Sequence, residues 1–418
     1  MSEKTIDLRR LVVKAFHMTD VEWGEENDFD YDGHMTVSKA MIDSLVAKEP
    51  LIEKIDIQII PPGEHDRYTE TIMDIVPISV KVLGNLGDGV THTVTGAYFI
   101  LTGVDTVGKP THEFGSSEGN LKEQLTLNRP GTPGDDDYII SFDVTLAAGK
   151  GQERPGPTAA HRALDEFMQT FREKLKSMDG NRATERHEFH DVIRPGAKRI
   201  VVIKQVAGQG AMYDMQLFPN EPGGFTGGKS IIDMGNMPVI VTPNEYRDGI
   251  LRSMQWRRVN MGIGPSTKET TLQHFRDPLL DVIQEDTDVD LAGIIIVGTP
   301  DDNVDKIRVG TRAAIMAECI RADGAIITAD GWGNSDVDYV NTCEQLGTRG
   351  IAVTGLKFIG RTAGFVVTNN YLDGIFDINK SESGTETDIV GQNNYDARDC
   401  RKALVVLKAK MAKNSRNR

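Results

Sequence analysis

One stretch that could carry chemistry is Pro-Asn-Glu-Tyr-Arg-Asp-Gly, at 243–249. It directly follows the apolar run 238–241, which is typical of a buried strand. At a strand end, Glu245 could transfer a proton, and Arg247 and Asp248 could orient a carboxylate or an amine. The same residue types also favour a helix N-terminus, where acidic side chains interact well with the helix dipole. The sequence leaves both interpretations open.

A second stretch, 270–278, contains a single histidine, His274. An imidazole titrates near neutral pH and can serve as a general acid or base. A lone histidine also occurs as a structural residue whose ring nitrogens are hydrogen-bonded within the fold. His274 is therefore a candidate catalytic residue with a structural alternative.

The third stretch, 330–336, has the sequence Asp-Gly-Trp-Gly-Asn-Ser-Asp and lies between a predicted strand and a predicted helix. Its glycines permit tight turns, and Ser335 or Asp336 is suited to cap the helix. Free backbone N–H groups at such a helix start could hold a carboxylate or a phosphate. A plain turn with a helix cap is the alternative. The glycine spacing matches neither a dinucleotide fingerprint nor a phosphate loop.

Metal and thiol chemistry receive little support. His187 and His190 lie three residues apart without the HExxH arrangement, in a charged stretch that we interpret as an inter-domain linker. Cys343 lies in the middle of a predicted helix, where cysteines usually act as small core residues. We therefore expect no metal site at His187 and His190, and no cysteine nucleophile.

The composition limits the class of protein. The chain has 418 residues, of which 39% are hydrophobic, so a large core is expected. A net charge of -15 disfavours nucleic-acid and membrane-surface partners. No apolar run approaches the ~20 residues that span a bilayer, and the first ten residues lack the apolar core of a signal peptide. The three cysteines fit a reducing compartment, so we expect a cytoplasmic protein.

The predicted fold class is α/β, with an N-terminal mostly-β region followed by a parallel α/β sheet with helices on both faces. We expect domains at 1–180 and 195–400, and a basic tail at 401–418 whose residues 408–418 form a frayed end. Buried strands are predicted at 200–203, 238–241, 291–297, 325–328, 351–354 and 364–368, with helices at 158–177, 303–322 and 337–346. The last four strands should share one parallel sheet.

Ligands of parallel sheets bind at the carboxyl edge of the strands. The loops 298–301, 331–336 and 245–248 are expected to converge there and to form the pocket.

At this point several segments resemble a known family. Thr270-Thr271, His274 and Asp277-Pro278, followed by the Gly-Asn-x-Asp loop at 333–336, resemble the proprotein subunit of component B of glycine/sarcosine/betaine reductase. The D-proline reductase proprotein is a more distant relative in this reading. Weaker likeness runs through the stretches 55–77, 92–103 and 363–370.

The resemblance implies a specific chemistry. In the family this subunit is cleaved at a cysteine that becomes a pyruvoyl group, and a partner subunit carrying a selenocysteine or cysteine completes the cleavage of a C–N bond. The corresponding stretch here, 257–267, has no cysteine, and the first cysteine of the chain is Cys319. Ser266 could replace it in principle, but the preceding Pro265 opposes the required geometry. We therefore expect an uncleaved chain of 46.0 kDa without a cysteine-derived pyruvoyl group.

The resemblance thus implies a subunit of a reductase-like complex that acts on a small nitrogenous substrate and has a second reductase-like protein subunit as partner. No cofactor can be named. The proposed catalytic residues are Glu245 and His274; the proposed substrate-binding residues are Arg247, Asp248, Thr270, Thr271, Asn334 and Asp336. Two alternatives stay open: a non-catalytic scaffold subunit, and a metal-dependent C–N hydrolase subunit.

Overall fold

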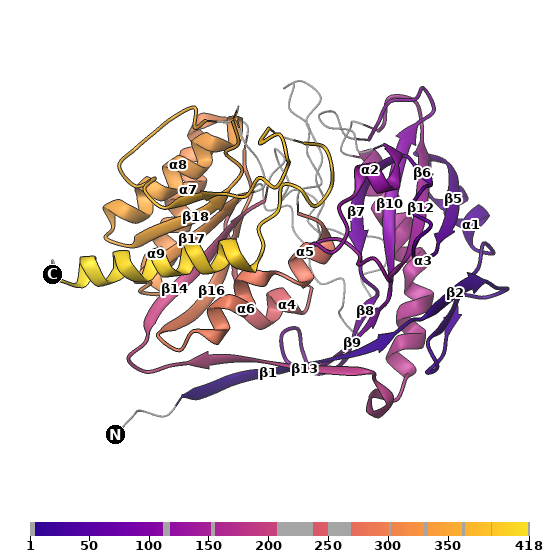
Figure 1. The fold of residues 1–418 in the computed structure, drawn as a ribbon, viewed down its shortest axis with the longest axis horizontal. Coiled ribbons are helices and arrows are strands. Elements are labelled where there is room, and N and C mark those ends of the chain that lie inside the picture. The colour runs from indigo at the N-terminus through magenta and orange to yellow at the C-terminus, as the bar shows by residue number, and fades with distance from the viewer. Residues whose placement is uncertain are drawn as a thin grey trace.

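The structure is a computed structural model, and it describes residues 5–111, 118–151, 155–206, 237–249, 269–300, 302–329, 333–361, 364–385 and 387–416. Within these ranges a strand-rich region is followed along the chain by a region built around one large sheet (Figure 1). The predicted α/β fold class is confirmed. No helix in these ranges is long and apolar enough to cross a membrane.

The N-terminal region contains two four-stranded sheets. One has the order β13-β1-β9-β8, from β1 (Ile6–His17), β8 (Ser79–Leu83), β9 (Gly89–Thr95) and β13 (Glu185–Ile193). The other has the order β5-β12-β10-β7, from β5 (Ile52–Ile60), β7 (Thr71–Val76), β10 (Ala97–Asp105) and β12 (Tyr138–Leu146). The smaller elements are β2 (Asp20–Trp23), β3 (Asp28–Phe29), β4 (His34–Val37), α1 (Ile42–Lys48), β6 (Tyr68–Thr69), β11 (Gly119–Asn120), α2 (Leu121–Gln124) and a 3₁₀ turn, Gly180–Arg182.

The helix α3 (Pro155–Ser177) completes the core of this region, as its apolar spacing predicts. Phe167 lies at the centre of that face, with its ring 5.3 Å from Phe142 and 5.9 Å from Phe99. Burial of such aromatic side chains stabilises a fold by about 1.5–3 kcal/mol each. The stretch 185–193, which we expected to be a linker, is instead the edge strand β13, paired antiparallel with β1.

The C-terminal region has a six-stranded sheet of order β15-β16-β14-β17-β18-β19. Its strands are β14 (Lys198–Gln205), β15 (Val239–Val241), β16 (Val289–Val297), β17 (Gly324–Ala329), β18 (Ala352–Lys357) and β19 (Ile375–Asp377). Every pair is parallel except β15 with β16. The helices of this region are α4 (Pro243–Arg247), α5 (Thr271–Phe275), α6 (Pro278–Glu285), α7 (Asn303–Cys319), α8 (Asn334–Thr348) and α9 (Ala397–Arg416).

Helices cover both faces of this sheet, as the continuous Ile/Val runs predict. On β14, Val201 and Ile203 pack with α7 and α8, whereas Ile200 and Val202 pack with α6 and α9. Cys343 of α8 is buried in the first of these cores, and burial raises the pKa of its thiol. The predicted strands at 291–297, 325–328 and 351–354 share this sheet.

Two expectations for this region are wrong. The stretch 364–368 is not a strand; β19 occupies the sheet edge beside β18 instead, and the Val366 backbone N–H donates to the Asp336 carboxylate. The basic tail is not frayed but forms most of α9. Its apolar residues recur at three- and four-residue spacing and are buried on β17 and β18, namely Ala403, Leu404, Leu407 and Met411.

Candidate functional site

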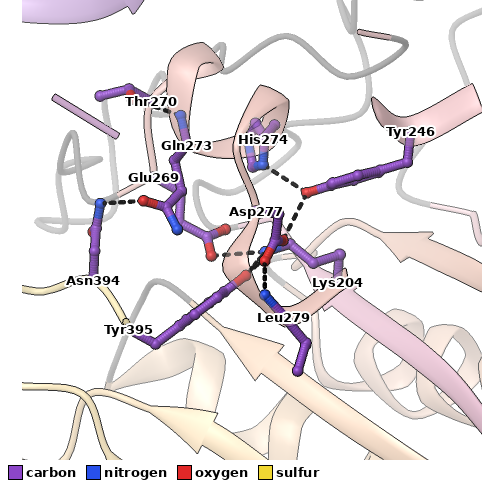
Figure 2. Close-up of polar contacts among 10 residues, drawn as sticks. All are labelled: Lys204, Tyr246, Glu269, Thr270, Gln273, His274, Asp277, Leu279, Asn394 and Tyr395. Atoms are coloured by element: carbon purple, nitrogen blue, oxygen red, sulfur yellow. Dashed lines mark hydrogen bonds and ion pairs between the residues drawn. The ribbon is translucent and has the colours of Figure 1, made fainter. Parts of the chain in front are cut away.

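Lys204, the penultimate residue of the central strand β14, is a charged residue in the interior of the protein. Its side chain is completely buried, and its Nζ lies 2.7 Å from Glu269 Oε1 and 3.3 Å from Asp277 Oδ2. Nζ also donates to the hydroxyl of Tyr395 at 2.7 Å. Figure 2 shows these contacts. An unpaired buried ammonium would cost several kcal/mol, so the surrounding acceptors are necessary for this fold.

These residues belong to a set that we call the buried network: Lys204, Tyr246, Glu269, His274, Asp277 and Tyr395. Burial alone would lower the pKa of Lys204, but the charges of Glu269 and Asp277 outweigh burial and raise it. Burial also raises the pKa of Glu269, against the opposing effect of Lys204. Lys204 is thus held as an ammonium and is poorly suited to act as a neutral amine nucleophile.

His274 enters the network from α5. Its Nδ1 lies 2.8 Å from the Tyr246 hydroxyl, which in turn is 3.4 Å from Asp277 Oδ2. Burial, and then the positive charge of Lys204, lower the pKa of His274 well below its ordinary value. Burial raises the pKa of Tyr246 well above its ordinary value. Near neutral pH both rings are therefore uncharged, and they extend a chain of hydrogen bonds to the Asp277 carboxylate.

The sequence around α5 explains why these side chains converge. Thr270 caps α5 by accepting from the Gln273 backbone N–H at 3.1 Å, and it donates to the Gly131 carbonyl at 2.6 Å. Asp277 caps α6 by accepting from the Leu279 backbone N–H, with Pro278 at the first helical position. Two adjacent capping motifs thus fix a sharp turn between α5 and α6. The Asp277 carboxylate serves both the cap and the network.

Two predicted substrate-binding residues join the two regions of the molecule. Thr271 donates both its backbone N–H, at 2.8 Å, and its hydroxyl, at 2.6 Å, to the buried Asp74 of β7. Asp248 is fully buried, forms an ion pair with Lys81 of β8 and accepts from the Gly87 backbone N–H at 2.8 Å. In this structure the polar groups of both side chains are engaged in contacts that hold the regions together.

Glu245 and Arg247 also have structural partners. Glu245 forms a capping box with Thr242 at the start of α4, accepting from its backbone N–H at 2.7 Å. Arg247 forms an ion pair with Asp281 at 2.7 Å and stacks over Phe189, with its guanidinium carbon 4.3 Å from the ring centroid.

The expected convergence of the segment 245–248 with the loops 298–301 and 331–336 at one sheet edge is wrong. β15 runs antiparallel to β16, with Val239 opposite Ile296 and Val241 opposite Ile294. The chain therefore leaves β15 toward the amino ends of the parallel strands, and α4 does not join the loops that follow β16 and β17. The run of four apolar residues at 238–241 does not indicate whether the strand is parallel or antiparallel to its neighbour.

Asp336 lies at the start of α8, away from the buried network. It is buried and forms an ion pair with Lys357 of β18 at 2.6 Å, instead of capping the helix. The cap position is Gly333, whose φ of 70° is readily adopted by glycine. Asn334 is the first residue of α8, and its side chain lies outside the described part of the structure. The predicted site residues thus do not form one cluster, and only His274 belongs to the buried network.

Sequence reasoning missed Lys204, Tyr246, Glu269 and Tyr395. Lys204 had a usable signal, because a lysine directly after the buried run 200–203 needs a carboxylate partner. Tyr395 had none.

Among the residues that the structure describes, no three His, Cys, Asp or Glu side chains gather as a metal-ligand set. His187 and His190 lie in β13, where they pair with Glu185 at 3.1 Å and with Asp7 at 2.8 Å. An offset of three residues in a strand places two side chains on opposite faces. The two histidines therefore do not point toward a common ligand.

Comparison with known proteins shows to which protein family this chain belongs. The family of glycine/sarcosine/betaine reductase component B subunits matches residues 9–111 and 185–361. The chain belongs to this family. It is 38% identical over 97% of its length to the D-proline reductase proprotein PrdA of Acetoanaerobium sticklandii, of which the match covers 63%. No solved structure matches the chain.

Identity to other members is lower. The chain is 23% identical to the glycine reductase complex component B subunits alpha and beta of the same organism, over 84% of the chain and 80% of the relative. It is 21% identical to the sarcosine reductase complex component B subunit alpha of Peptoclostridium acidaminophilum, with the same coverage. The predicted family is confirmed. We expected the D-proline reductase proprotein to be the more distant relative, and this is wrong, because the chain is more similar to it than to the glycine and sarcosine reductase subunits.

Proposed function

We propose that this chain is a component-B-type subunit of a cytoplasmic reductase complex. In this role it binds a small nitrogenous substrate and presents it to a second reductase-like protein subunit, which cleaves a C–N bond. Family membership supports the reductase role.

The single structural observation that carries the proposal is the position of the buried network. Glu269 and Asp277 are bound to Lys204 next to the carboxyl end of the central strand, and this edge binds ligands in parallel sheets. They follow the stretch 257–267, which corresponds to the family's reactive segment and lies outside the described residues. The network anchors the chain directly after that segment and so fixes where it returns to the sheet.

The network itself is suited to positioning. Lys204 is a compensated ammonium, and His274 is a neutral ring in contact with Tyr246. Groups held in this way supply orientation and a defined electrostatic field, which account for much of an enzyme's rate advantage. We propose His274 as a positioning residue whose neutral state is set by burial, in place of the general-base role suggested by the sequence.

We further propose that the subunit works without a cysteine-derived pyruvoyl group. The stretch 257–267 contains no cysteine, and Cys319 is the first in the chain. Mass spectrometry of the denatured protein tests this directly. An intact chain of 46.0 kDa is expected, and two fragments that separate near Ser266 would contradict it.

The names of the relatives suggest substrates to test, beginning with D-proline and followed by glycine and sarcosine. The complex is purified from the native host through a tag on this chain, and its subunits are identified by mass spectrometry. We expect a second reductase-like subunit and reductant-dependent C–N cleavage of one substrate. Recovery of this chain alone, with full activity, would contradict the need for a partner.

A non-catalytic scaffold is the second candidate, and it is favoured by the missing cysteine together with the mutual pairing inside the network. Substituting Arg247→Ala, His274→Asn and Asn334→Ala in the purified complex separates the two. Unchanged kcat and KM in all three stably folded variants would favour the scaffold. A metal-dependent hydrolase would instead turn over without reductant and lose activity with chelator.

A further inference from the structure

A cleft of about 460 Å³ is lined by Leu272 and Phe275 of α5. These two residues share a helix face at three-residue spacing, whereas His274, which joins the buried network, lies on another face of α5. Its walls come from β1, β9 and β13 of the N-terminal region and from α4, α5 and α6. The polar side chains that line it include Tyr98, Glu185, His187, Arg247, Arg276 and Asp281. The volume falls in the range of about 300–1,000 Å³ that is typical of small-molecule sites.

The charges in this cleft are not evenly matched. Arg247 is paired with Asp281 at 2.7 Å, and Glu185 with His187 at 3.1 Å. Arg276 contacts the hydroxyl of Tyr98, and its guanidinium carbon lies 4.7 Å from the centre of that ring. Within the described parts of the chain, no carboxylate lies within ion-pair distance of Arg276. Arg276 thus has a neutral partner and can accept an anion.

The neighbouring groups restrict which anion fits. A guanidinium presents a planar fork of N–H groups that matches the two oxygens of a carboxylate. Glu185 and Asp281 line the same cleft and would repel a doubly charged phosphate more strongly than a monoanion. The half-buried Phe275 offers an apolar surface for the rest of the ligand.

Tyr98 adds a second fixed group. It is buried in β10, and burial raises its pKa to about 12 even against the opposing charge of Arg276. The phenol therefore stays neutral near pH 7. It holds the guanidinium in place without neutralising its charge. A side chain that is already held in place loses little conformational entropy when it binds a ligand.

From these observations we propose that the cleft is a binding site for a small monocarboxylate with a compact apolar body, whose carboxylate pairs with Arg276. This binding site does not depend on the proposed reductase role, because ligand binding to the cleft can be measured on this chain without a partner subunit.

Isothermal titration of the full chain tests the proposal with benzoate, cyclohexanecarboxylate and 3-phenylpropionate, each beside its neutral carboxamide. We expect at least one carboxylate to bind about tenfold or more tightly than its carboxamide. Arg276→Gln should abolish that difference by weakening the carboxylate alone. Phe275→Ala should weaken both members of the pair, which places binding in the cleft. Arg308→Gln, at an exposed arginine of α7, is the matched control and should change neither.

Three results would overturn the inference: no carboxylate binding up to about 10 mM, equal binding of carboxylate and carboxamide by the wild type, or equal carboxylate binding by the wild type and Arg276→Gln. The comparison within the wild type keeps the test decisive if a variant fails to fold.

Discussion

The two sides of α5 use charge differently. On one side, the buried carboxylates of Glu269 and Asp277 are both paired with Lys204 inside the protein. On the other side, the exposed Arg276 side chain donates a hydrogen bond to the neutral phenol of Tyr98. The first arrangement should contribute to stability and positioning, and the second to ligand binding. Substitutions on the two sides should therefore have different effects, on folding stability for the network and on ligand binding for Arg276.

The largest effect is expected for Lys204→Met. This change leaves Glu269 and Asp277 close together in the core without their cation, and breaking a buried ion pair in this way costs about 3–5 kcal/mol. Chemical denaturation should show a correspondingly lower free energy of unfolding. Lys122→Met, at an exposed lysine, is the control and should leave the midpoint unchanged. A stable Lys204→Met protein would show that the network does not hold the fold.

Tyr395→Phe should have a smaller effect. The hydroxyl accepts from Lys204 at 2.7 Å and donates to Asp277 Oδ2 at 2.7 Å, so its removal leaves two buried charged groups with one partner fewer. Hydrogen bonds to charged groups contribute about 1.5–3 kcal/mol, and we expect a loss of that size in the free energy of unfolding. Tyr246→Phe, which removes a hydroxyl bound mainly to a neutral ring, should cost less. A larger loss for Tyr246→Phe would reverse our ranking of the two phenols.

The stability of the protein should depend on pH through His274. The pKa of His274 in the folded protein lies well below its ordinary value of 6.5, so the unfolded chain takes up a proton first as the pH falls. The contribution of His274 to the free energy of unfolding is therefore fully present above pH 6.5. Below pH 6.5 the free energy of unfolding declines by up to about 1.4 kcal/mol per pH unit. His274→Asn should flatten that part of the profile, as measured by unfolding at pH 5 to 7.5. Parallel profiles for the two proteins would contradict a buried neutral imidazole.

The smallest effect on stability is expected for Arg276→Gln. An exposed side chain outside the core usually changes the free energy of unfolding by no more than about 0.5 kcal/mol. Its melting temperature should match that of the wild type, while carboxylate binding is lost. A destabilisation comparable to that of Tyr395→Phe would assign Arg276 to the structural side of α5.

The sequence predicted much of the C-terminal sheet because buried parallel strands have continuous apolar runs, as at 294–297 and 325–328. It could not predict strand direction at 239–241, since three apolar residues are compatible with either orientation. The site was predicted less well. Polar residues near strand ends were selected by type, and nothing in the sequence shows that Asp248 pairs with Lys81 or that Asp336 pairs with Lys357. Such partners are brought together only by the tertiary fold.

The strand order of the six-stranded sheet bears on what would happen to a chain cut between Gly249 and Glu269. β14 and β15 precede the cut and the other four strands follow it, yet the order β15-β16-β14-β17 alternates between the two pieces. The pieces would be interleaved within a single sheet and joined further by the hydrogen bonds from Thr271 to Asp74. They could not separate without unfolding that sheet. A cleaved protein would therefore elute from a sizing column like an intact one, and only a denaturing measurement would reveal the cut.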